Sequence, residues 1–265
     1  MRRKRRAGPP EKYVAQGRGQ GVGPNYIPWL TVRDVPSTGL STRSKDRRSG
    51  RVRHTLSTGE TRLLRLADWG DRVLDAREQF PLLPLRETVA IAATLGVRPP
   101  AVRREPIVMT TDVLFTLKIE NGRAEKLAVA FKLSSDLRKP RVLEKLAIES
   151  VYWSRRNVRW IVLSETELPN ELCINLRRLD AWHDPRSFRP DDPHRAVRLA
   201  ELHQYLLAHS HVPLAQSCRD FDTVMRWPRG ESLAAVHFAL AHHLWRVDLR
   251  APIDTLAVPC FLTPE

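Results

Sequence analysis

Asp112 and Lys132 lie twenty residues apart in two apolar segments that Asn121 and Gly122 separate. An Asn-Gly pair is typical of a hairpin turn, so segments 107–117 and 127–133 are predicted to be antiparallel strands. Cutting a phosphodiester with metal ions requires carboxylates that hold the cation, and a lysine often steadies the attacking water. The pair therefore indicates a nuclease site, while an ordinary cross-strand ion pair is the alternative that spacing alone leaves open.

The length of the hairpin loop decides whether the two side chains can meet. A two-residue loop at 121–122 would place Asp112 opposite Phe131 and turn Lys132 to the other face of the sheet. The nuclease interpretation therefore requires a three-residue loop or a bulge, and Gly122 permits either.

Glu60 is a second carboxylate candidate, although its local sequence favours another role. Ser57-Thr-Gly-Glu60 has the form of a capping box and precedes Leu63, Leu64 and Ala67 at helical spacing. A helix is therefore predicted from about Thr58 to Gly70, with Glu60 as a partner of its N-cap. Spacing alone does not assign a metal to Glu60.

The elements around these residues follow an α/β order. A strand is predicted over 73–80 before Pro81 and Pro84, a helix over 140–156, and a short apolar strand over 158–163. From residue 169 the predicted elements are helices over 170–182, 194–209 and 230–243, then a hairpin of 245–249 with 256–258. We expect an α/β domain over 26–168 and a smaller, mainly helical, winged-helix-like domain over 169–265.

The charge balance indicates a polyanionic partner. Lys and Arg number 44 against 30 Asp and Glu, giving a formal charge of +14 and a pI near 10.5. Residues 1–25 are predicted to be a flexible basic arm. A second basic run precedes the helix at Thr58 and is predicted to face DNA; its members are Arg43, Lys45, Arg47, Arg48, Arg51 and Arg53.

Neither a membrane segment nor a disulfide framework is indicated. No run of 18 apolar residues occurs, and the basic start leads into Gly-Pro-Pro rather than an apolar signal core. We therefore expect a cytoplasmic protein with no membrane contact. The three cysteines are far apart and form no CxxC pair.

Several segments closely resemble the TnsA family, the endonuclease subunits of heteromeric cut-and-paste transposases. They are collinear from about residue 16 to 168. The most specific is the string Arg77-Glu-Gln-Phe-Pro-Leu-Leu-Pro84, and the others are Gly17–Gly21, Tyr26–Val32, Met109-Thr-Thr-Asp112, Leu143–Leu146 and Tyr152-Trp153. After residue 170 the resemblance rests mainly on the helical, winged-helix-like pattern of the sequence.

The resemblance implies a restriction-endonuclease-like core, with a mixed central sheet flanked by helices. It implies that Glu60 and Asp112 hold Mg²⁺ or Mn²⁺ and that Lys132 is the catalytic lysine. The family usually has Gln or an acid two residues before that lysine, where this chain has Ala130, so only the Phe131 carbonyl remains beside it as a metal ligand. Glu149, one helical turn beyond Lys145, is a further candidate to assist at the site, but an exposed ion pair with Lys145 is expected in preference.

The resemblance also implies partners. They are double-stranded DNA at transposon ends, cut on the 5′ strands, a TnsB-type transposase and a TnsC-type AAA+ ATPase. Because Ala130 removes a ligand, the alternative is a catalytically weakened structural adaptor that links transposase and ATPase on DNA. A basic nuclease outside transposition is a third hypothesis.

Overall fold

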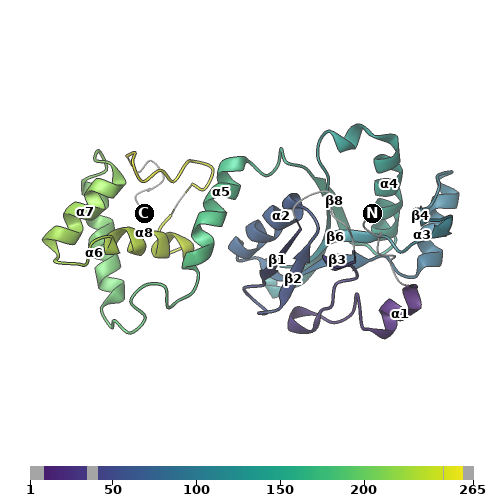
Figure 1. Ribbon diagram of the computed structural model, residues 1–265, viewed down its shortest axis with the longest axis horizontal. Helices are drawn as coiled ribbons and strands as arrows, with labels where there is room; N and C mark the ends of the chain where they lie inside the picture. Colours follow the sequence, from purple (N-terminus) through teal and green to yellow (C-terminus); the bar gives the residue numbers. More distant parts are fainter. Residues whose placement is uncertain (1–8, 35–40, 247, 259–265) are drawn as a thin grey trace, which may run out of the picture. The chain divides into compact units, whose positions relative to one another are not determined.

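The computed structural model describes residues 9–34, 41–246 and 248–258, and it divides into two compact units, Met1–Leu168 and Pro169–Glu265 (Figure 1). The first unit contains, in chain order, α1 (Pro10–Ala15), η1 (Gly23–Asn25), β1 (Thr42–Lys45), β2 (Val52–Thr55), α2 (Thr58–Trp69), β3 (Val73–Pro81), α3 (Leu85–Thr94), β4 (Ala101–Val102), β5 (Glu105–Pro106), β6 (Thr110–Lys118), η2 (Glu120–Gly122), β7 (Ala124–Phe131), η3 (Asp136–Arg138), α4 (Pro140–Ser154) and β8 (Arg159–Leu163). In the described part of the chain, no helix is long and apolar enough to cross a membrane.

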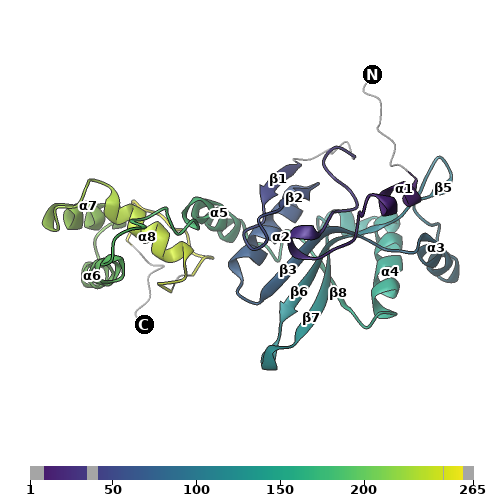
Figure 2. The ribbon, with the colours of Figure 1, turned by 90° about the horizontal axis from the view of Figure 1, so that it is seen from below.

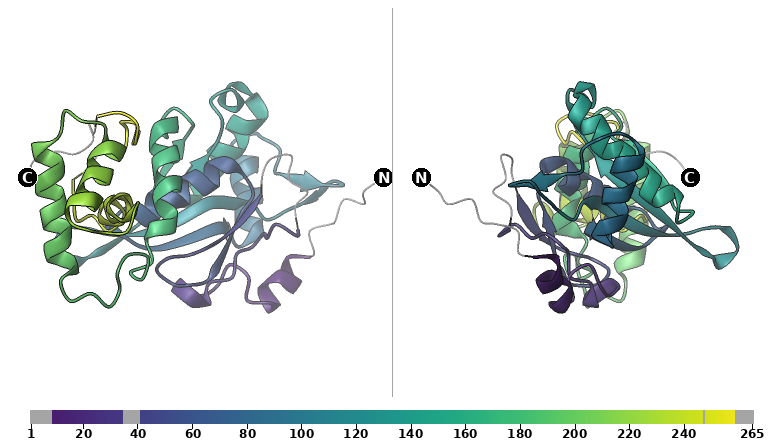
Figure 3. Two further views of the ribbon diagram at one scale, coloured as in Figure 1. Left: turned by 60° about the vertical axis from the view of Figure 1, so that its left-hand side comes forward. Right: turned by 90° about the vertical axis from the view of Figure 1, so that its right-hand side faces the viewer.

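A mixed sheet of four strands in the order β3-β6-β7-β8 forms the centre of the first unit. β3, β6 and β7 are antiparallel neighbours, whereas β8 runs parallel to β7. Helices α3 and α4 lie together on one side of the sheet and α2 on the other, and the tip of the β6–β7 hairpin extends beyond them (Figures 2 and 3). The predicted α/β domain with a mixed sheet and flanking helices is confirmed.

The main core packs α3 and α4 against the two central strands. Leu114 of β6 and Ala128 of β7 meet Ile91, Ile148 and Trp153 from the helices, and each is at most 2% exposed. Burying an aliphatic or aromatic side chain of this kind stabilises a fold by about 1.5–3 kcal/mol. This packing fixes where β6 begins and β7 ends, the two places at which Asp112 and Lys132 occur.

The flexible arm expected over 1–25 is not what the described part of that segment forms. Residues 10–15 are helical, and the Tyr13 ring is 5% exposed and packs edge-on against Trp29, 5.1 Å between ring centroids. Arg18 donates to the Trp29 carbonyl at 2.9 Å and pairs with Asp34 at 2.7 Å. Aromatic burial and the partly buried Arg18 therefore hold the segment on the domain. Residues 1–8 of the predicted arm lie outside the described residues.

The second unit is helical, with α5 (Asn170–Leu179), η4 (Asp180–Trp182), α6 (Arg195–Ala208), α7 (Leu214–Val224) and α8 (Glu231–Ala241). The three helices predicted there are confirmed, and α7 is an additional one.

The hairpin predicted over 245–249 and 256–258 is wrong for its described residues, which contain no strand. Asn175 of α5 donates to the carbonyls of Leu249 and Ala251 at 3.0 and 2.8 Å. The backbone at 255–257 instead accepts from the first turn of α7. Backbone carbonyls of this segment accept hydrogen bonds from helices α5 and α7 and not from a partner strand, so the expected hairpin does not form among the described residues.

Candidate active site

The β6–β7 hairpin has the three-residue loop that a shared site requires. Val113 pairs with Val129 and Lys118 with Ala124, which leaves Glu120–Gly122 as the loop beyond the closing 119–123 pair. Asn121 and Gly122 have φ of 68° and 73°, a left-handed conformation that Asn and Gly adopt more readily than other residues. This register brings Asp112 and Lys132 to the same face of the sheet.

Asp112 and Lys132 are in direct contact. Lys132 Nζ donates to Asp112 Oδ2 at 2.8 Å and to the Phe131 carbonyl oxygen at 2.8 Å. The Phe131 N–H donates to the same Asp112 oxygen at 2.8 Å. Two oxygens from neighbouring strands thus converge on one positive charge at the sheet edge, where a hard cation would find the same ligands.

Glu60 makes the predicted capping contacts and also lies within the electrostatic field of Asp112. Its N–H donates to Ser57 Oγ at 3.2 Å, and its Oε2 accepts from the Leu56 N–H at 2.9 Å. Gln79 Nε2 donates to the same Oε2 at 3.1 Å. Burial, followed by the negative charge of Asp112, raises the pKa of Glu60 to about 7. The cap therefore holds this carboxylate beside the sheet rather than in solvent.

The exposed ion pair expected for Glu149 is wrong, because this side chain is buried. It is 4% exposed, and Thr111 Oγ1 donates to its Oε1 at 2.7 Å. Burial, then the charge of Asp112, raises the pKa of Glu149 to about 7. Helical spacing contained the missed signal, since Glu149 falls three residues after Leu146 and four before Trp153, both buried in the core.

Lys132 stays protonated in this setting. Burial lowers the pKa of Lys132, but the charge and hydrogen bond of Asp112, with the charges of the two glutamates, raise it above its ordinary value. The lysine is therefore a permanent hydrogen-bond donor and not a general base.

The donor set has the chemistry of a divalent-cation site, although its side chains are not gathered into a ready cluster. Among the residues that the structure describes, no group of three or more His, Cys, Asp or Glu side chains is placed to hold a metal ion. Two buried glutamates with pKa values near 7 nevertheless flank Asp112, so excess negative charge is unfavourable there without a counter-cation. Carboxylate and carbonyl oxygens are the ligands that Mg²⁺ and Mn²⁺ prefer.

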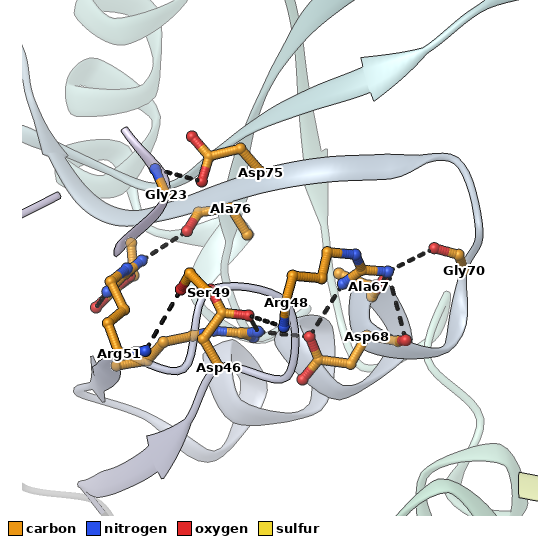
Figure 4. Close-up of polar contacts among 12 residues, drawn as sticks. Gly23, Asp46, Arg48, Ser49, Arg51, Ala67, Asp68, Gly70, Asp75 and Ala76 are labelled. Atoms are coloured by element: carbon orange, nitrogen blue, oxygen red, sulfur yellow. Dashed lines mark hydrogen bonds and ion pairs between the residues drawn. The ribbon is translucent and has the colours of Figure 1, made fainter. Parts of the chain in front are cut away.

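Three arginines of the predicted DNA-facing run make hydrogen bonds and ion pairs within the domain. Arg53 is 1% exposed and bonds to Asp46 and Asp68, each at 2.5 Å. Arg51 pairs with the buried Glu78 at 2.5 Å. As Figure 4 shows, Arg51 also reaches the Ala76 carbonyl, and Arg48 donates to the Ala67 and Gly70 carbonyls at the end of α2.

These three arginines tie the β1–β2 turn to α2 and β3. The DNA contact expected of the buried Arg53 and of the partly buried Arg51 is therefore corrected to a structural contact, whereas Arg48 is exposed and its DNA contact stays a prediction. Of the other three cations in the run, Arg43 and Lys45 are exposed and Arg47 is partly buried.

Comparison with known proteins gives a family match and a similar curated protein. Residues 70–165 match the family described as TnsA-like endonuclease N terminal, a range that contains Asp112, Lys132 and Glu149 but not Glu60. The chain is 42% identical over 155 residues to the Transposon Tn7 transposition protein TnsA of Escherichia coli. That alignment covers 58% of this chain and 56% of that protein, so the chain spans about half the length of this curated relative. Over residues 70–165, which contain all four strands of the central sheet, this chain is similar to the TnsA-like endonuclease N-terminal family.

Proposed function

We propose that this chain is a metal-dependent DNA endonuclease subunit of a transposition machine. The observation that carries the proposal is the convergence of Asp112 Oδ2 and the Phe131 carbonyl on Lys132 Nζ, within a TnsA-like segment. Asp112, the Phe131 carbonyl and Glu60 would hold Mg²⁺ or Mn²⁺. When bound, such an ion activates water and stabilises charge on the phosphate.

The chain's own residues supply positioning and a proton donor. Lys132, kept protonated by its neighbours, donates a hydrogen bond to oxygen at the reacting phosphate. Asp112 also accepts a hydrogen bond from the Phe131 N–H, which holds its carboxylate in one orientation beside Lys132. The fully buried Ala130 contributes no side-chain ligand at the end of β7, so a water molecule would complete the cation's coordination.

DNA is the proposed substrate, and the excess positive charge supports it. Phosphate binding needs only exposed cations. Arg43, Lys45, Arg47 and Arg48 remain candidates in the basic run, because the side chains of Arg51 and Arg53 are buried against carboxylates. We propose that the cut falls on the 5′ strands at transposon ends, and that a TnsB-type transposase and a TnsC-type AAA+ ATPase are the partners.

The test is nicking of transposon-end DNA by the full chain with both partner proteins and Mg²⁺. Asp112→Asn and Lys132→Met should each lower the 5′-strand nicking rate on the order of 10²–10³-fold, the effect of removing one preorganised electrostatic contact. Lys139→Met is a matched control, because Lys139 is exposed and its ion pair among the described residues is with its neighbour Asp136. Nicking that persists in both active-site variants would refute the assignment.

The adaptor function is tested by the same assay. Assembly of the complex with no metal-dependent cleavage by the parent chain, together with cleavage gained by Ala130→Gln, would support the adaptor instead. Abundant Mg²⁺-dependent nicking by the parent would exclude it.

A further inference from the structure

Gln79 occupies an unusual position beside the proposed site. It lies in β3 between the pairs Glu78–Val113 and Phe80–Thr111, and thus opposite Asp112 on the adjacent strand. Its side chain is buried, and its backbone φ of 49° is left-handed, which is uncommon for a residue other than glycine. Such a conformation persists only where the surroundings determine it, and it is concentrated at functional sites.

The side-chain amide of Gln79 joins two elements of the site. Its Nε2 donates to Glu60 Oε2 at 3.1 Å, and its Oε1 accepts from Thr110 Oγ1 at 2.9 Å. Its backbone carbonyl accepts from the Trp29 N–H at 3.2 Å, which holds the residue from the other side. An ionised carboxylate only accepts hydrogen bonds, so Nε2 must be the atom that faces Glu60.

The contact with Gln79 differs in kind from the other contacts of Glu60. Ser57 and Leu56 belong to the N-terminal end of α2, so their hydrogen bonds fix Glu60 only relative to its own helix. Gln79 belongs to the sheet that carries Asp112. Its amide is therefore the described hydrogen bond that sets the Glu60 carboxylate relative to Asp112.

The neutrality of the amide suits this place. Glu60 and Asp112 are both carboxylates, so a third carboxylate in place of Gln79 would add to the repulsion between like charges. A neutral donor stabilises the ionised form without occupying the position of a cation.

We propose that Gln79 is a positioning residue that holds Glu60 in place to bind the divalent cation with Asp112. This inference rests on the proposed function. It predicts that removing the amide contact weakens cation binding through Glu60, in addition to any effect on stability.

The experiment measures Mn²⁺ affinity of the full chain, without DNA, by electron paramagnetic resonance, together with the thermal unfolding midpoint. Gln79→Asn is the test variant, because Asn tolerates a left-handed backbone but its amide is one carbon shorter. Thr88→Val is the control, because Thr88 is buried in the same unit and its hydroxyl, in the part of the chain that the structure describes, donates within the first turn of α3 to the Leu85 carbonyl at 3.0 Å.

Gln79→Asn should weaken Mn²⁺ binding about tenfold or more, the equivalent of losing one hydrogen bond to a charged group. Thr88→Val should leave Mn²⁺ affinity unchanged whatever its effect on the unfolding midpoint. In a Glu60→Gln background, Gln79→Asn should have little further effect, because the amide acts through Glu60. A purely structural role would give additive losses.

A spectroscopic measurement on the folded parent keeps the inference testable if Gln79→Asn fails to fold. The Nε2 resonances of Gln79 should shift in Glu60→Gln; unchanged resonances would overturn the inference. Parent-like Mn²⁺ affinity in Gln79→Asn would overturn the inference alone and leave the nuclease proposal standing. Failure of the parent itself to bind Mn²⁺ or to nick DNA would overturn the proposed function and this inference with it.

Discussion

Replacing Arg53 with methionine separates the two interpretations of the basic run. If Arg53 contacts DNA, the variant should fold normally and bind DNA less tightly. The structure predicts the opposite, because the guanidinium is 1% exposed and bonds to Asp46 and Asp68 at 2.5 Å. Methionine keeps much of the side-chain volume, so the perturbation is chiefly the loss of charge and of two hydrogen bonds.

The magnitude follows from leaving the buried Asp46 without its cation, since Asp68 keeps its ion pair with Arg48 at 3.2 Å. Removing one partner of a buried ion pair costs about 3–5 kcal/mol. For a domain of roughly 150–250 residues, each kcal/mol lowers the unfolding midpoint by about 2–4 °C. We therefore expect the midpoint of Arg53→Met to fall by roughly 6–20 °C. Arg43→Met, at an exposed position, should stay within about 0.5 kcal/mol of the parent.

The same network gives the variant a pH signature. Burial raises the pKa of Asp46, but hydrogen bonds from Arg53 and Ser49, with the charge of Arg53, lower it to about 2 overall. A depressed carboxyl pKa contributes stability that is present above its unfolded value of 3.8 and is lost as pH falls through 2. Without Arg53 the pKa of Asp46 should rise. The stability of Arg53→Met should therefore depend less on pH between 3.8 and 2 than that of the parent.

The assays are calorimetric unfolding between pH 2 and 8 and DNA binding over a salt series, well below each variant's midpoint. If Arg43 contacts phosphate, Arg43→Met should reduce the salt-dependence slope by about one ion, and Arg53→Met should leave it unchanged. An Arg53→Met protein with the parent's unfolding midpoint and weakened DNA binding would refute the buried-network interpretation.

Three further predictions concern the site and the second unit. Glu60 and Glu149 have folded-state pKa values of about 7, above the ordinary 4.5, so the metal-free chain should lose stability as pH rises from 4.5 to 7. Mg²⁺ should reverse this loss. Calorimetric unfolding at both ends of that pH window, with and without Mg²⁺, checks the prediction. A Cβ at Gly59 would overlap the Phe131 ring, so Gly59→Ala should cost about 1–3 kcal/mol and impair nicking, and adding Phe131→Leu should recover the stability in urea unfolding. Asn175→Ala should release the C-terminal segment from α5, seen as faster proteolysis there and about 1–3 kcal/mol of lost stability; an unchanged cleavage rate would contradict the anchoring role.

The hairpin shows how far local sequence determines this site. Alternating apolar residues around Asn121-Gly122 predict two antiparallel strands, and those strands are present. Their register depends on whether the loop has two or three residues, and both are compatible with an Asn-Gly pair. A difference of one residue in the loop moves Lys132 to the opposite face of the sheet. The sequence therefore shows that a shared site requires a three-residue loop, but it does not determine the loop length.

The basic run shows a limit of a different kind. Within residues 43–53 the cations outnumber the single acid, Asp46, and the segment looks like a solvated surface. Apart from Asp46, the acids that pair with Arg48, Arg51 and Arg53 come from α2 and β3, more than a dozen residues away in the chain. Burial of an arginine is decided by such distant partners, which a local count of charges cannot include.

The observed capping contacts of Glu60 do not exclude the metal-ligand role that we propose for it. A carboxylate has two oxygens and about four acceptor sites, so it can satisfy a helix terminus and retain capacity for a cation. Leu56 and Ser57 hold Glu60 at the start of α2, and Gln79 connects it to the strand beside Asp112. The cap that seemed to argue against a metal role supplies the rigidity that a ligand needs, because an ordered carboxylate loses less entropy when a cation binds.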